Sequence, residues 1–564
     1  MRFHSLNKTT LAVFLAVAVF GCKKIDLTPL DRYTDANFWI VNDNVNSALA
    51  TCYQQQFSGG YPGSSSASQA FFYNEAMSDN AYCPLDVNVG TPSSIASGNL
   101  AVFNSQINRV KYEWGSYYTN IRSCNLLLAN IDKNTTLGGG VIARMKAEAR
   151  FLRAHALFRL TNFFGNVPLE TAVLTPDEAK VMPQTPKAQV VAYIISQLDS
   201  AAAALPRRED YSAADNGRVT RGAALALKAR VQLYNGMWQD VVNTCEELMN
   251  NQSVDGAYSL VPDYADIFLV NNKYNSEVMF SLGYVPVLRT WSDWSDFGPF
   301  YTGPSSTAAS NSNLVPTQDL VESFLTLDGK GIFEAGSGYD ENNAPYANRD
   351  PRLTYTVVYD KYQWKNNQGT TTIYIKPGTD PVQPGKNEYS PSTVKTTTGY
   401  YWRKYFDATP PTGTFNYGED IIILRWADVL LMYAEAKTEL GQMDAPTWDK
   451  TIKPIRARAG FVNPLALNYP GNTGMSMLDQ VRNERRSELA FESLRLDDIK
   501  RWKIAEVVLN HPVGNEVRGA KFANNNTAFI KTQVRTFDPS KMYLWPIPQE
   551  SLQTDPKLTQ NPGW

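Results

Sequence analysis

Histidine is scarce in this chain, with only three among 564 residues. The imidazole ring is a common general base near neutral pH and a frequent zinc ligand, so histidine-rich metal sites and imidazole catalysis are disfavoured. An excess of one charge is also lacking, because 53 Lys and Arg balance 55 Asp and Glu for a formal net charge of -2. No global positive field exists to hold a polyanion, so nucleic acid is not an expected partner.

Cysteine is nearly as rare, with five residues. Cys52, Cys83, Cys124 and Cys245 are too few for a disulfide scaffold in a chain of this length, and their spacings match no zinc pattern. Sequence cannot choose among the ways of pairing them. Small buried thiols are the favoured interpretation, with one bridge as an open alternative.

Long apolar runs are missing beyond the first residues, since no later segment reaches the ~18 consecutive apolar residues of a membrane helix. Residues 11–20 (LAVFLAVAVF) are apolar throughout, follow Arg2 and Lys8, and rise only about 15 Å as a helix. This pattern predicts a signal peptide over residues 1–21.

The junction after this apolar run resembles the lipoprotein box of bacteria, in which a cysteine is diacylated. Val19 and Gly21 stand three and one residues before Cys22. We therefore expect a lipid on Cys22 and a tether over residues 22–40. Cleavage near Gly21 to give an ordinary secreted protein is the alternative.

Residues 141–164 have the apolar spacing of a long helix with two stripes on nearly opposite sides. Such a helix must be packed on both faces, as the inner helix of a layered stack is. The stripes comprise Ile142, Met145, Ala149, Leu152, Ala156, Leu160 and Phe163, and Ala147, Phe151, Ala154 and Phe158.

Residues 217–250 and 425–459 each predict helix, short turn and helix within roughly 34 residues, the period of a tetratricopeptide repeat. In the first pair Thr220 is a plausible N-cap and Gly236 ends the first helix. The pattern predicts an all-α fold built from tetratricopeptide-like helix pairs. Further helices are expected over residues 112–132 and 476–509.

Two stretches are irregular, residues 58–105 and 251–420, and are rich in Gly, Ser and aromatic residues. Short alternating runs at 354–360 and 371–376 predict a few short strands. Long loops inside a compact protein are usually functional or disordered. We expect an N-terminal helical region over 41–250, a loop-rich, ligand-facing region over 251–420 and a C-terminal helical region over 421–564.

Aromatic residues make up 12% of the chain, and several gather in the segment WSDWSDFGPFY, residues 291–301. Aromatic faces beside carboxylates and amides suit a sugar, whose CH face stacks on a ring while its hydroxyl groups bond to Asp or Asn. A loop that folds its aromatic residues inward as a small core is an equal alternative. The expected ligand-binding residues are Trp291, Trp294, Asp293, Asp296, Phe300 and Tyr301, with Tyr82, Asp79, Asn80 and Asn74 as the opposite wall.

Glu484 and Glu488 are four residues apart and so face one side of a helix, which permits a proton-sharing catalytic pair or a cation site. A structural role is favoured, because nearby arginine residues can compensate both carboxylates. The expected partners are Arg482, Arg485 and Arg486, and the expected extensions of the network are Glu492 with Arg495 and Asp497 with Arg501.

His155 and His511 are expected to be structural, since a hydrolase triad needs an activated nucleophile and the chain has no G-x-S-x-G. Residues 86–90 and 340–343 lack the full ligand set of a calcium loop. No metal and no cofactor is expected.

Several stretches, in order along nearly the whole chain, together resemble the SusD/RagB family of outer-membrane nutrient-binding lipoproteins of Bacteroidetes. They are Cys22 followed by DLTPLDRYTDANFW (26–39), AEARFLRAHALFRLTNFFGNVPL (147–169), AALALKARVQLYNGMW (223–238), RDPRL (349–353), IILRWADVLLMYAEAKTEL (422–440), RNERRSELAFESLRLDDIKRW (482–502) and YLWPIPQESLQTDPKLTQNPGW (543–564).

The resemblance implies an all-α fold of helix pairs that supports a loop-rich ligand face. It also implies a lipid tether to the outer membrane, facing the cell exterior, and a SusC-like TonB-dependent transporter as partner. The leading hypothesis is a lipoprotein that binds an oligosaccharide or polysaccharide without cleaving it and delivers it to that transporter. The alternatives are a peptide-binding import lipoprotein, a glycan-cleaving enzyme, and a helical scaffold with no small ligand.

Overall fold

The computed structural model describes most of the chain. The described residues are 34, 37–57, 71–84, 92–98, 109–286, 288, 298–299, 312, 314–366, 369–391, 395–407, 418–510, 516–522 and 527–564.

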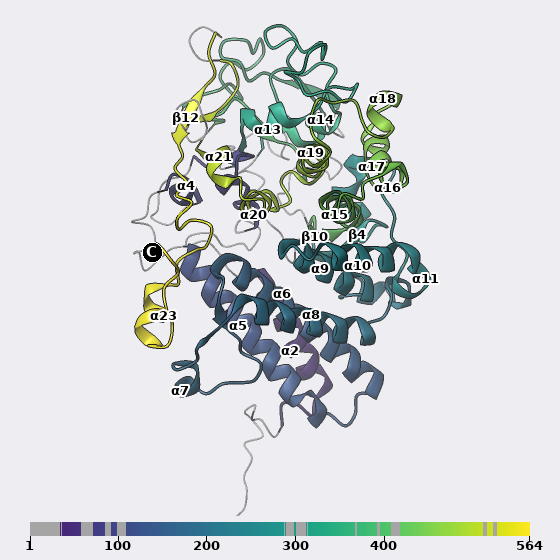
Figure 1. The fold of residues 1–564 in the computed structure, drawn as a ribbon, viewed down its shortest axis with the longest axis vertical. Helices are drawn as coiled ribbons and strands as arrows, with labels where there is room; N and C mark the ends of the chain where they lie inside the picture. Colours follow the sequence, from purple (N-terminus) through teal and green to yellow (C-terminus); the bar gives the residue numbers. More distant parts are fainter. Residues whose placement is uncertain are drawn as a thin grey trace, which may run out of the picture.

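The long helices form a stack that begins in the lower part of the molecule in Figure 1, with α2, α5, α6 and α8, and continues upwards through α9, α10 and α15 to α19. Each helix packs against the next along the chain, from α5 through α6, α8, α9, α10 and α15 to α19, and α2 packs on α5. Their bounds are α2 Asn42–Gln54, α5 Arg109–Asn130, α6 Gly139–Phe164, α8 Lys187–Ala204, α9 Arg221–Tyr234, α10 Trp238–Asn250, α15 Trp426–Glu439 and α19 Met477–Leu489.

Shorter helices fill the connections and the outer layers. They are α4 Pro92–Ala96, α7 Pro176–Ala179, α11 Gln252–Asp255, α13 Gln318–Ser323, α14 Arg352–Thr356, α16 Ala445–Lys450, α17 Ile452–Ala459, α18 Pro464–Leu467, α20 Arg495–Arg501, α21 Ala505–Leu509 and α23 Gln549–Thr554.

Helix α6 is buried on both faces, as its two apolar stripes predict. Leu152 and Leu160 on one stripe are fully buried, and so are Phe151 and Phe158 on the other. The neighbouring helices α5 and α8 cover it. The helix ends at Gly165, whose positive φ of 73° lets its N–H reach the carbonyl of Thr161 at 3.0 Å.

The expected helix pair at 217–250 is confirmed as α9 and α10. Thr220 caps α9, since its hydroxyl accepts a hydrogen bond from the Ala223 N–H at 3.1 Å. Gly236 adopts a positive φ of 68° in the turn between the helices. The pair expected at 425–459 is α15 followed by α16 and α17.

The strands form two-stranded antiparallel sheets only, among the described residues. The mostly helical fold class is therefore confirmed. The pairs are β1 Ala81–Tyr82 with β5 Val315–Pro316, β2 Val167–Pro168 with β3 Gln184–Thr185, β4 Val278–Leu282 with β10 Ile421–Arg425, β6 Val357–Val358 with β9 Tyr401–Trp402, β7 Tyr362–Asn366 with β8 Gly369–Ile373, and β11 Glu516–Arg518 with β12 Lys531–Val534.

The strand expected over residues 354–360 is only partly correct. Its first residues complete α14, and β6 contributes just two residues. The run at 371–376 falls within and after β8, as expected.

The C-terminal segment packs against the end of α6. The indole of Trp545 stacks on Phe163, with ring centroids 4.2 Å apart, and the Trp545 N–H donates to the Phe163 carbonyl at 2.7 Å. The Asn561 amide donates to the carbonyls of Phe164 and Trp545 at 2.9 and 2.7 Å. Residues near the end of the chain thus cover a helix from its first third.

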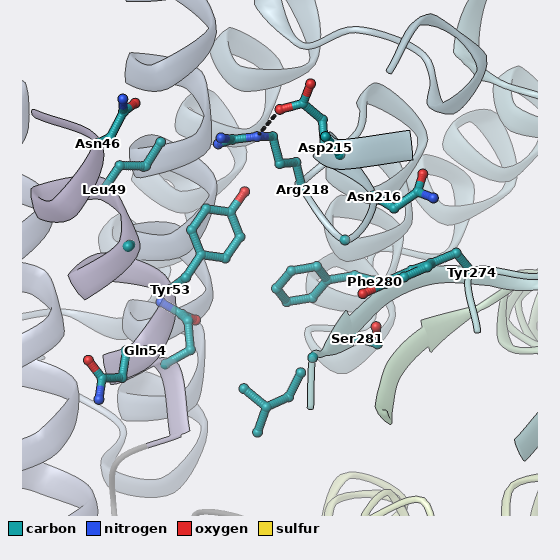
Figure 2. A pocket seen from close by; sticks show the side chains of 16 residues that line it. Asn46, Leu49, Tyr53, Gln54, Asp215, Asn216, Arg218, Tyr274, Phe280 and Ser281 are labelled. Atoms are coloured by element: carbon teal, nitrogen blue, oxygen red, sulfur yellow. Dashed lines mark hydrogen bonds and ion pairs between the residues drawn. The ribbon is translucent and has the colours of Figure 1, made fainter. Parts of the chain in front are cut away.

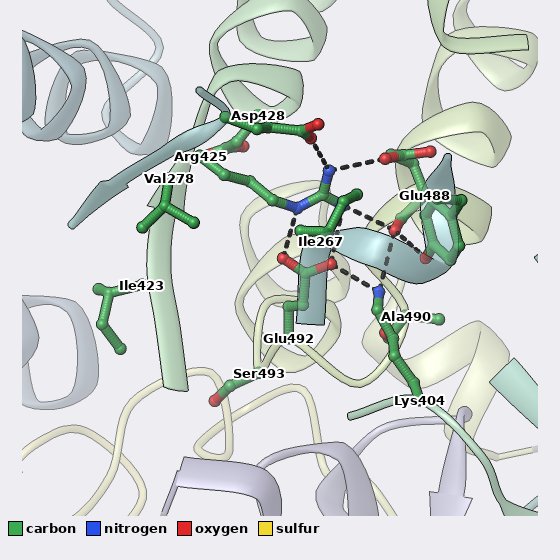
Figure 3. Close-up of polar contacts among 12 residues, drawn as sticks. Ile267, Val278, Lys404, Ile423, Arg425, Asp428, Glu488, Ala490, Glu492 and Ser493 are labelled. Carbon is green, nitrogen blue, oxygen red and sulfur yellow. Dashed lines mark hydrogen bonds and ion pairs between the residues drawn. The ribbon is translucent and has the colours of Figure 1, made fainter. Parts of the chain in front are cut away.

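A buried network of charges joins segments that are far apart in sequence (Figure 3). The Arg425 guanidinium contacts three carboxylates, those of Glu277 at 2.6 Å and of Glu488 and Glu492 at 2.7 Å. The Lys404 ammonium adds an ion pair to Glu492 at 2.6 Å. All five side chains are almost completely buried, so each charge depends on the others for stabilisation.

Glu484 and Glu488 are compensated as expected, but the expected partners are wrong. Arg352 and Arg456 contact Glu484, and Arg352, Arg425 and Arg458 contact Glu488. Burial alone would raise the pKa of both carboxyls, and these guanidinium groups hold it below the usual range instead.

The remaining expected pairs do not form either, and most of their members pair with residues of other elements, although Arg501 also pairs with Asp498 of its own helix α20. Arg482, Arg485 and Arg486 pair with Glu439, with Asp428 and Asp498, and with Asp79. Glu492 pairs with Lys404 and Arg425, Arg495 with Asp79, Asp497 with Arg159, and Arg501 with Glu435 and Asp498. Within one helix, sequence proximity suggested local pairs, whereas the buried faces of these helices meet charges from other elements.

Candidate functional site

Many of the expected ligand-binding residues lie outside the described residues. These expected ligand-binding residues are Trp291, Asp293, Trp294, Asp296, Phe300 and Tyr301. The expected lipidation site Cys22, His511 and residues 86–90 also lie outside the described residues. Their roles stay predictions.

Asn74, Asp79 and Asn80 lie in the described part and are buried, with 4%, 5% and 0% of their surface exposed. Asp79 receives hydrogen bonds from Arg495 at 2.8 and 2.9 Å and an ion pair from Arg486 at 2.9 Å. Burial would raise the pKa of this carboxyl, and the two arginines hold it below its usual range.

The two amides belong to the same buried layer. The Asn74 amide donates to the Ser493 hydroxyl at 2.6 Å, and its oxygen accepts from Arg109 at 2.5 Å. The Asn80 oxygen accepts from Arg486 at 2.9 Å. These contacts attach the stretch to helices α5 and α19 and to the α19–α20 connection, so all three side chains already have partners within the protein.

Tyr82 is half-buried in β1, where it pairs with Val315 of β5. The aromatic segment 291–301 lies between β4 and β5 in the sequence. The β1–β5 pairing therefore brings the two irregular stretches together at one point, as a shared ligand face requires.

A pocket of about 380 Å³ opens between α2, the loop before α9 and the start of the second irregular stretch (Figure 2). One wall is the last turns of α2, another is the loop 214–218 that leads into α9, and the third is Tyr274 with β4 and Gly283. The size suits a small ligand or one end of a larger one. The sequence did not single out this pocket, because its walls come from three separate segments.

Aromatic rings and amides line the pocket. Figure 2 shows the rings of Tyr53 and Phe280 approaching from opposite walls, with Tyr274 beyond Phe280. The side chains of Asn46, Gln54 and Asn216 are exposed at the pocket and have no hydrogen-bond partner within the described residues. Free amides beside ring faces can accept and donate hydrogen bonds to hydroxyl groups of a ligand.

A charged cluster stands behind the rings. The Tyr53 hydroxyl donates to Glu148 at 2.7 Å, and Arg218 contacts Glu148 at 3.2 Å and Asp215 at 2.7 Å. Burial raises the pKa of Tyr53, and the Glu148 carboxylate raises it further. The cluster fixes the Tyr53 ring and leaves Asp215 and Arg218 partly open to the pocket.

Tyr274 is held in an unusual backbone conformation, with a φ of 55°. Its carbonyl accepts a hydrogen bond from Arg208 at 2.9 Å, and its ring lies over Gly217. A Cβ atom at Gly217 would lie 3.2 Å from both Cε1 and the hydroxyl of Tyr274. Burial, followed by Asp420, raises the pKa of Tyr274 to about 12, so its hydroxyl is a neutral donor.

His155 and the pair Glu484 and Glu488, the described side chains considered for catalysis, have partners within the protein. His155 is buried, and its Nδ1 is 2.7 Å from Oε1 of Gln56. Among the described residues, no group of His, Cys, Asp and Glu is arranged to hold a metal ion. The Asp340 carboxylate accepts hydrogen bonds from the backbone N–H groups of Asn342 and Asn343 in its own loop.

The described residues thus combine a helical framework with an open pocket of aromatic rings and unpartnered amides, an arrangement suited to binding a small ligand. No helix in the described ranges combines the length and apolar character of a membrane span. Residues 276–564 match the SusD family, and residues 68–233 match a family described as starch-binding and associating with the outer membrane. The chain belongs to the SusD family, which confirms the resemblance of its sequence motifs.

Relatives and solved structures agree with this membership. SusD-like protein P25 of Formosa agariphila is 24% identical over 97% of this chain and 97% of its own length. The crystal structure of a SusD-like carbohydrate binding protein of Bacteroides fragilis is 29% identical, with a TM-score of 0.78 over 93% of this chain and all of that one. A second SusD-like protein of Bacteroides fragilis is 25% identical, with a TM-score of 0.77 over 95% of this chain and 100% of that chain. The SusD family consists of binding proteins, so the chain is not an enzyme.

Proposed function

We propose that this protein is a lipoprotein of the outer-membrane surface that binds an oligosaccharide or polysaccharide and delivers it to a SusC-like TonB-dependent transporter. Cys22 carries the lipid, and residues 22–40 form the tether. The observation that carries the proposal is the pocket in which aromatic rings and unpartnered amides face the same space.

The comparisons support the ligand class. The family matched by residues 68–233 is described as starch-binding, and the Bacteroides fragilis protein of similar fold is described as carbohydrate binding. A neutral sugar polymer also agrees with the near-zero net charge, because stacking on rings requires no charge.

Two neighbouring surfaces contribute to binding in this proposal. The segment 291–301 supplies Trp291 and Trp294 as stacking platforms, and the pocket supplies amides and the ring of Tyr274. The segment follows β4, whose residues Phe280, Ser281 and Leu282 line the pocket, within the same stretch of the sequence.

Calorimetric titration of the form that begins after residue 22, against a panel of glycans and peptides, tests the proposal. We expect saturable, metal-independent binding of a glycan, and a roughly tenfold or greater loss of affinity for Trp291→Ala or Trp294→Ala, since aromatic anchors dominate binding energy. Tyr112→Ala, which removes an exposed ring on α5, is the matched control and should bind normally.

Each other outcome points to a different conclusion. Normal binding by both tryptophan variants would remove segment 291–301 from the site, and Gln54→Ala and Asn216→Ala would then test the pocket alone. Binding of peptides in place of glycans would overturn the ligand class. A blank screen together with co-purification of the transporter would favour a scaffold without a small ligand.

A further inference from the structure

A second cavity, of about 730 Å³, lies outside the site described above. Figure 1 places α13, α19 and α21, which line it, in the upper part of the molecule, whereas α2, one wall of the first pocket, lies in the lower part. The two cavities share no lining residue. We call the second cavity the upper cleft. Its walls come from α13 and Leu325, the loop 331–334, residues 474–475, α19, α21, β11 and Asp79.

An exposed aromatic ring lines the upper cleft on the side of the loop 331–334. Phe333 is 70% exposed, and its ring meets that of Tyr339 edge to face, with centroids 5.9 Å apart. Val507 of α21, which also lines the cleft, is 64% exposed. Single exposed apolar residues are ordinary on a protein surface, but an exposed ring at a cavity is available for stacking by a sugar ring.

A carboxylate stands beside this ring. Glu334 follows Phe333 directly, and one of its oxygens accepts a hydrogen bond from the Gly331 N–H at 3.2 Å. Glu334 forms no ion pair with another described residue. Its carboxylate can therefore accept further hydrogen bonds from hydroxyl groups of a ligand.

Three charged side chains of α13 and β11 form another wall, which we call the charged wall. The Arg518 guanidinium contacts the carboxylates of Glu322, at 2.7 Å, and of Asp319. Arg518 and Asp319 are each 19% exposed, and Glu322 is 13% exposed. Parts of the charged wall thus stay accessible, and they offer both hydrogen-bond donors and acceptors.

Contacts between the walls fix the shape of the upper cleft. The Asn483 amide of α19 donates to the carbonyl of Ser323, at the end of α13, at 2.8 Å. A Cβ atom at Gly474 would lie 3.6 Å from the carboxyl carbon of Glu334, so the segment before α19 packs against the loop 331–334. The cleft is therefore formed without a ligand, which lowers the entropic cost of binding.

The charges of the lining disfavour an acidic ligand. Like charges across an interface oppose binding, so carboxylates in excess reject a uronic acid or a sulfated sugar. Hydroxyl groups donate to carboxylates and accept from guanidinium groups, so a neutral sugar can use both kinds of group. Four carboxylates and two guanidinium groups line the upper cleft, those of Asp79, Asp319, Glu322, Glu334, Arg486 and Arg518.

We propose that the upper cleft is a second binding site for a neutral glycan, in which a sugar ring stacks on Phe333 and its hydroxyl groups bond to Glu334 and the charged wall. The inference rests on the glycan ligand of the proposed function and adds a second place at which the same polymer is held. A chain held at two places binds more tightly than at either alone, because the second contact is intramolecular.

Affinity electrophoresis in gels that contain starch, laminarin, mannan or galactan tests the proposal. We expect at least one of these neutral polymers to retard the form that begins after residue 22, and Phe333→Ala to lower the affinity for that polymer about tenfold or more. Glu334→Gln, which keeps the size of the side chain, should also bind more weakly. Tyr112→Ala removes another exposed ring and, as the matched control, should migrate like the wild type.

Calorimetry with a short oligosaccharide cut from the retarding polymer counts the sites. We expect two molecules bound per protein for the wild type and one for Phe333→Ala. Because Phe333 is largely exposed, its removal should leave the Tm unchanged. A single site in the wild type that persists in Phe333→Ala would overturn the proposal.

The outcomes separate this inference from the proposed function. Normal retardation of Phe333→Ala and Glu334→Gln, with a loss in Trp291→Ala, would overturn the second site and leave the proposed function standing. A loss in Phe333→Ala alone would support the upper cleft and remove segment 291–301 from the binding surface. Retardation by none of the neutral polymers would overturn both. Binding of oligolysine that is lost in Glu334→Gln would also overturn the inference, since the cleft would then take a cationic peptide.

Discussion

At the scale of single residues, His155 gives the clearest link between burial and pH. Burial, reinforced by Arg159 and Arg230, lowers its pKa from 6.5 to about 3. The folded state therefore keeps the ring neutral, whereas the unfolded state takes up a proton below pH 6.5. The contribution of His155 to the free energy of unfolding is therefore fully present above pH 6.5. It is lost as the pH falls towards 3, by about 1.4 kcal/mol per pH unit.

His155→Gln should remove this dependence. The variant is neutral throughout, so its free energy of unfolding, measured with denaturant between these pH values, should fall less steeply than that of the wild type. Equal slopes for the two proteins would mean that His155 titrates alike in the folded and unfolded states.

Residue roles were the hardest part to predict from sequence. Polar side chains in a Tyr-rich stretch suit a sugar, which predicts ligand contacts for Asn74, Asp79 and Asn80. In the structure, arginines about 400 residues away in the sequence donate hydrogen bonds to Asp79 and Asn80 instead. The sequence correctly predicts that arginines compensate Glu484 and Glu488. The arginines that do so lie outside α19, and they are Arg352, Arg425, Arg456 and Arg458. Periodicity reports which face of a helix a residue occupies and not which element covers that face.

At the scale of elements, the loop before α9 positions one wall of the pocket. Gly217 has a φ of 90° and lies beneath the Tyr274 ring. Gly217→Ala should displace this ring, because the added Cβ would crowd it at 3.2 Å, and should also strain the loop by about 1 kcal/mol. We expect weaker glycan binding, measured by titration, and a modest loss in the free energy of unfolding.

Gly338→Ala is the matched control for this change. Gly338 has a φ of 69°, but a Cβ there would meet nothing within 4 Å. It should therefore show the backbone strain without the loss of binding. If both variants bind like the wild type, the position of Tyr274 does not matter for the ligand.

Long helices could be predicted well, since their apolar spacing is a local property of the sequence. The two stripes of α6 correctly indicated packing on both faces, and Thr220 and Gly236 marked the ends of α9. Short elements were predicted less well. Residues 354–356 are helical, although their alternating pattern suggests a strand, because the contacts of α14 with α19 override weak local preference.

At the scale of the whole molecule, Arg425 joins segments from the middle and the end of the chain. Arg425→Met would leave Glu277, Glu488 and Glu492 without part of their compensation in a buried site. We expect a loss of about 3–5 kcal/mol in the free energy of unfolding, because an unpaired buried charge is costly. Denaturant unfolding measures this.

Lys453→Met provides the comparison, since its ion pair with Asp449 at 3.1 Å is exposed. It should cost about 0.5 kcal/mol or less. Similar losses for the two variants would show that burial of the network contributes little.

The attachment of the C-terminal segment to α6 has a consequence for the timing of folding. Phe163 and Phe164 receive their covering from Trp545 and Asn561, and the last of these contacts spans 397 residues. Contacts of such long sequence separation form late and slow the completion of folding. The end of the inner helix thus stays partly uncovered until the C-terminal residues have been synthesised and have packed against it.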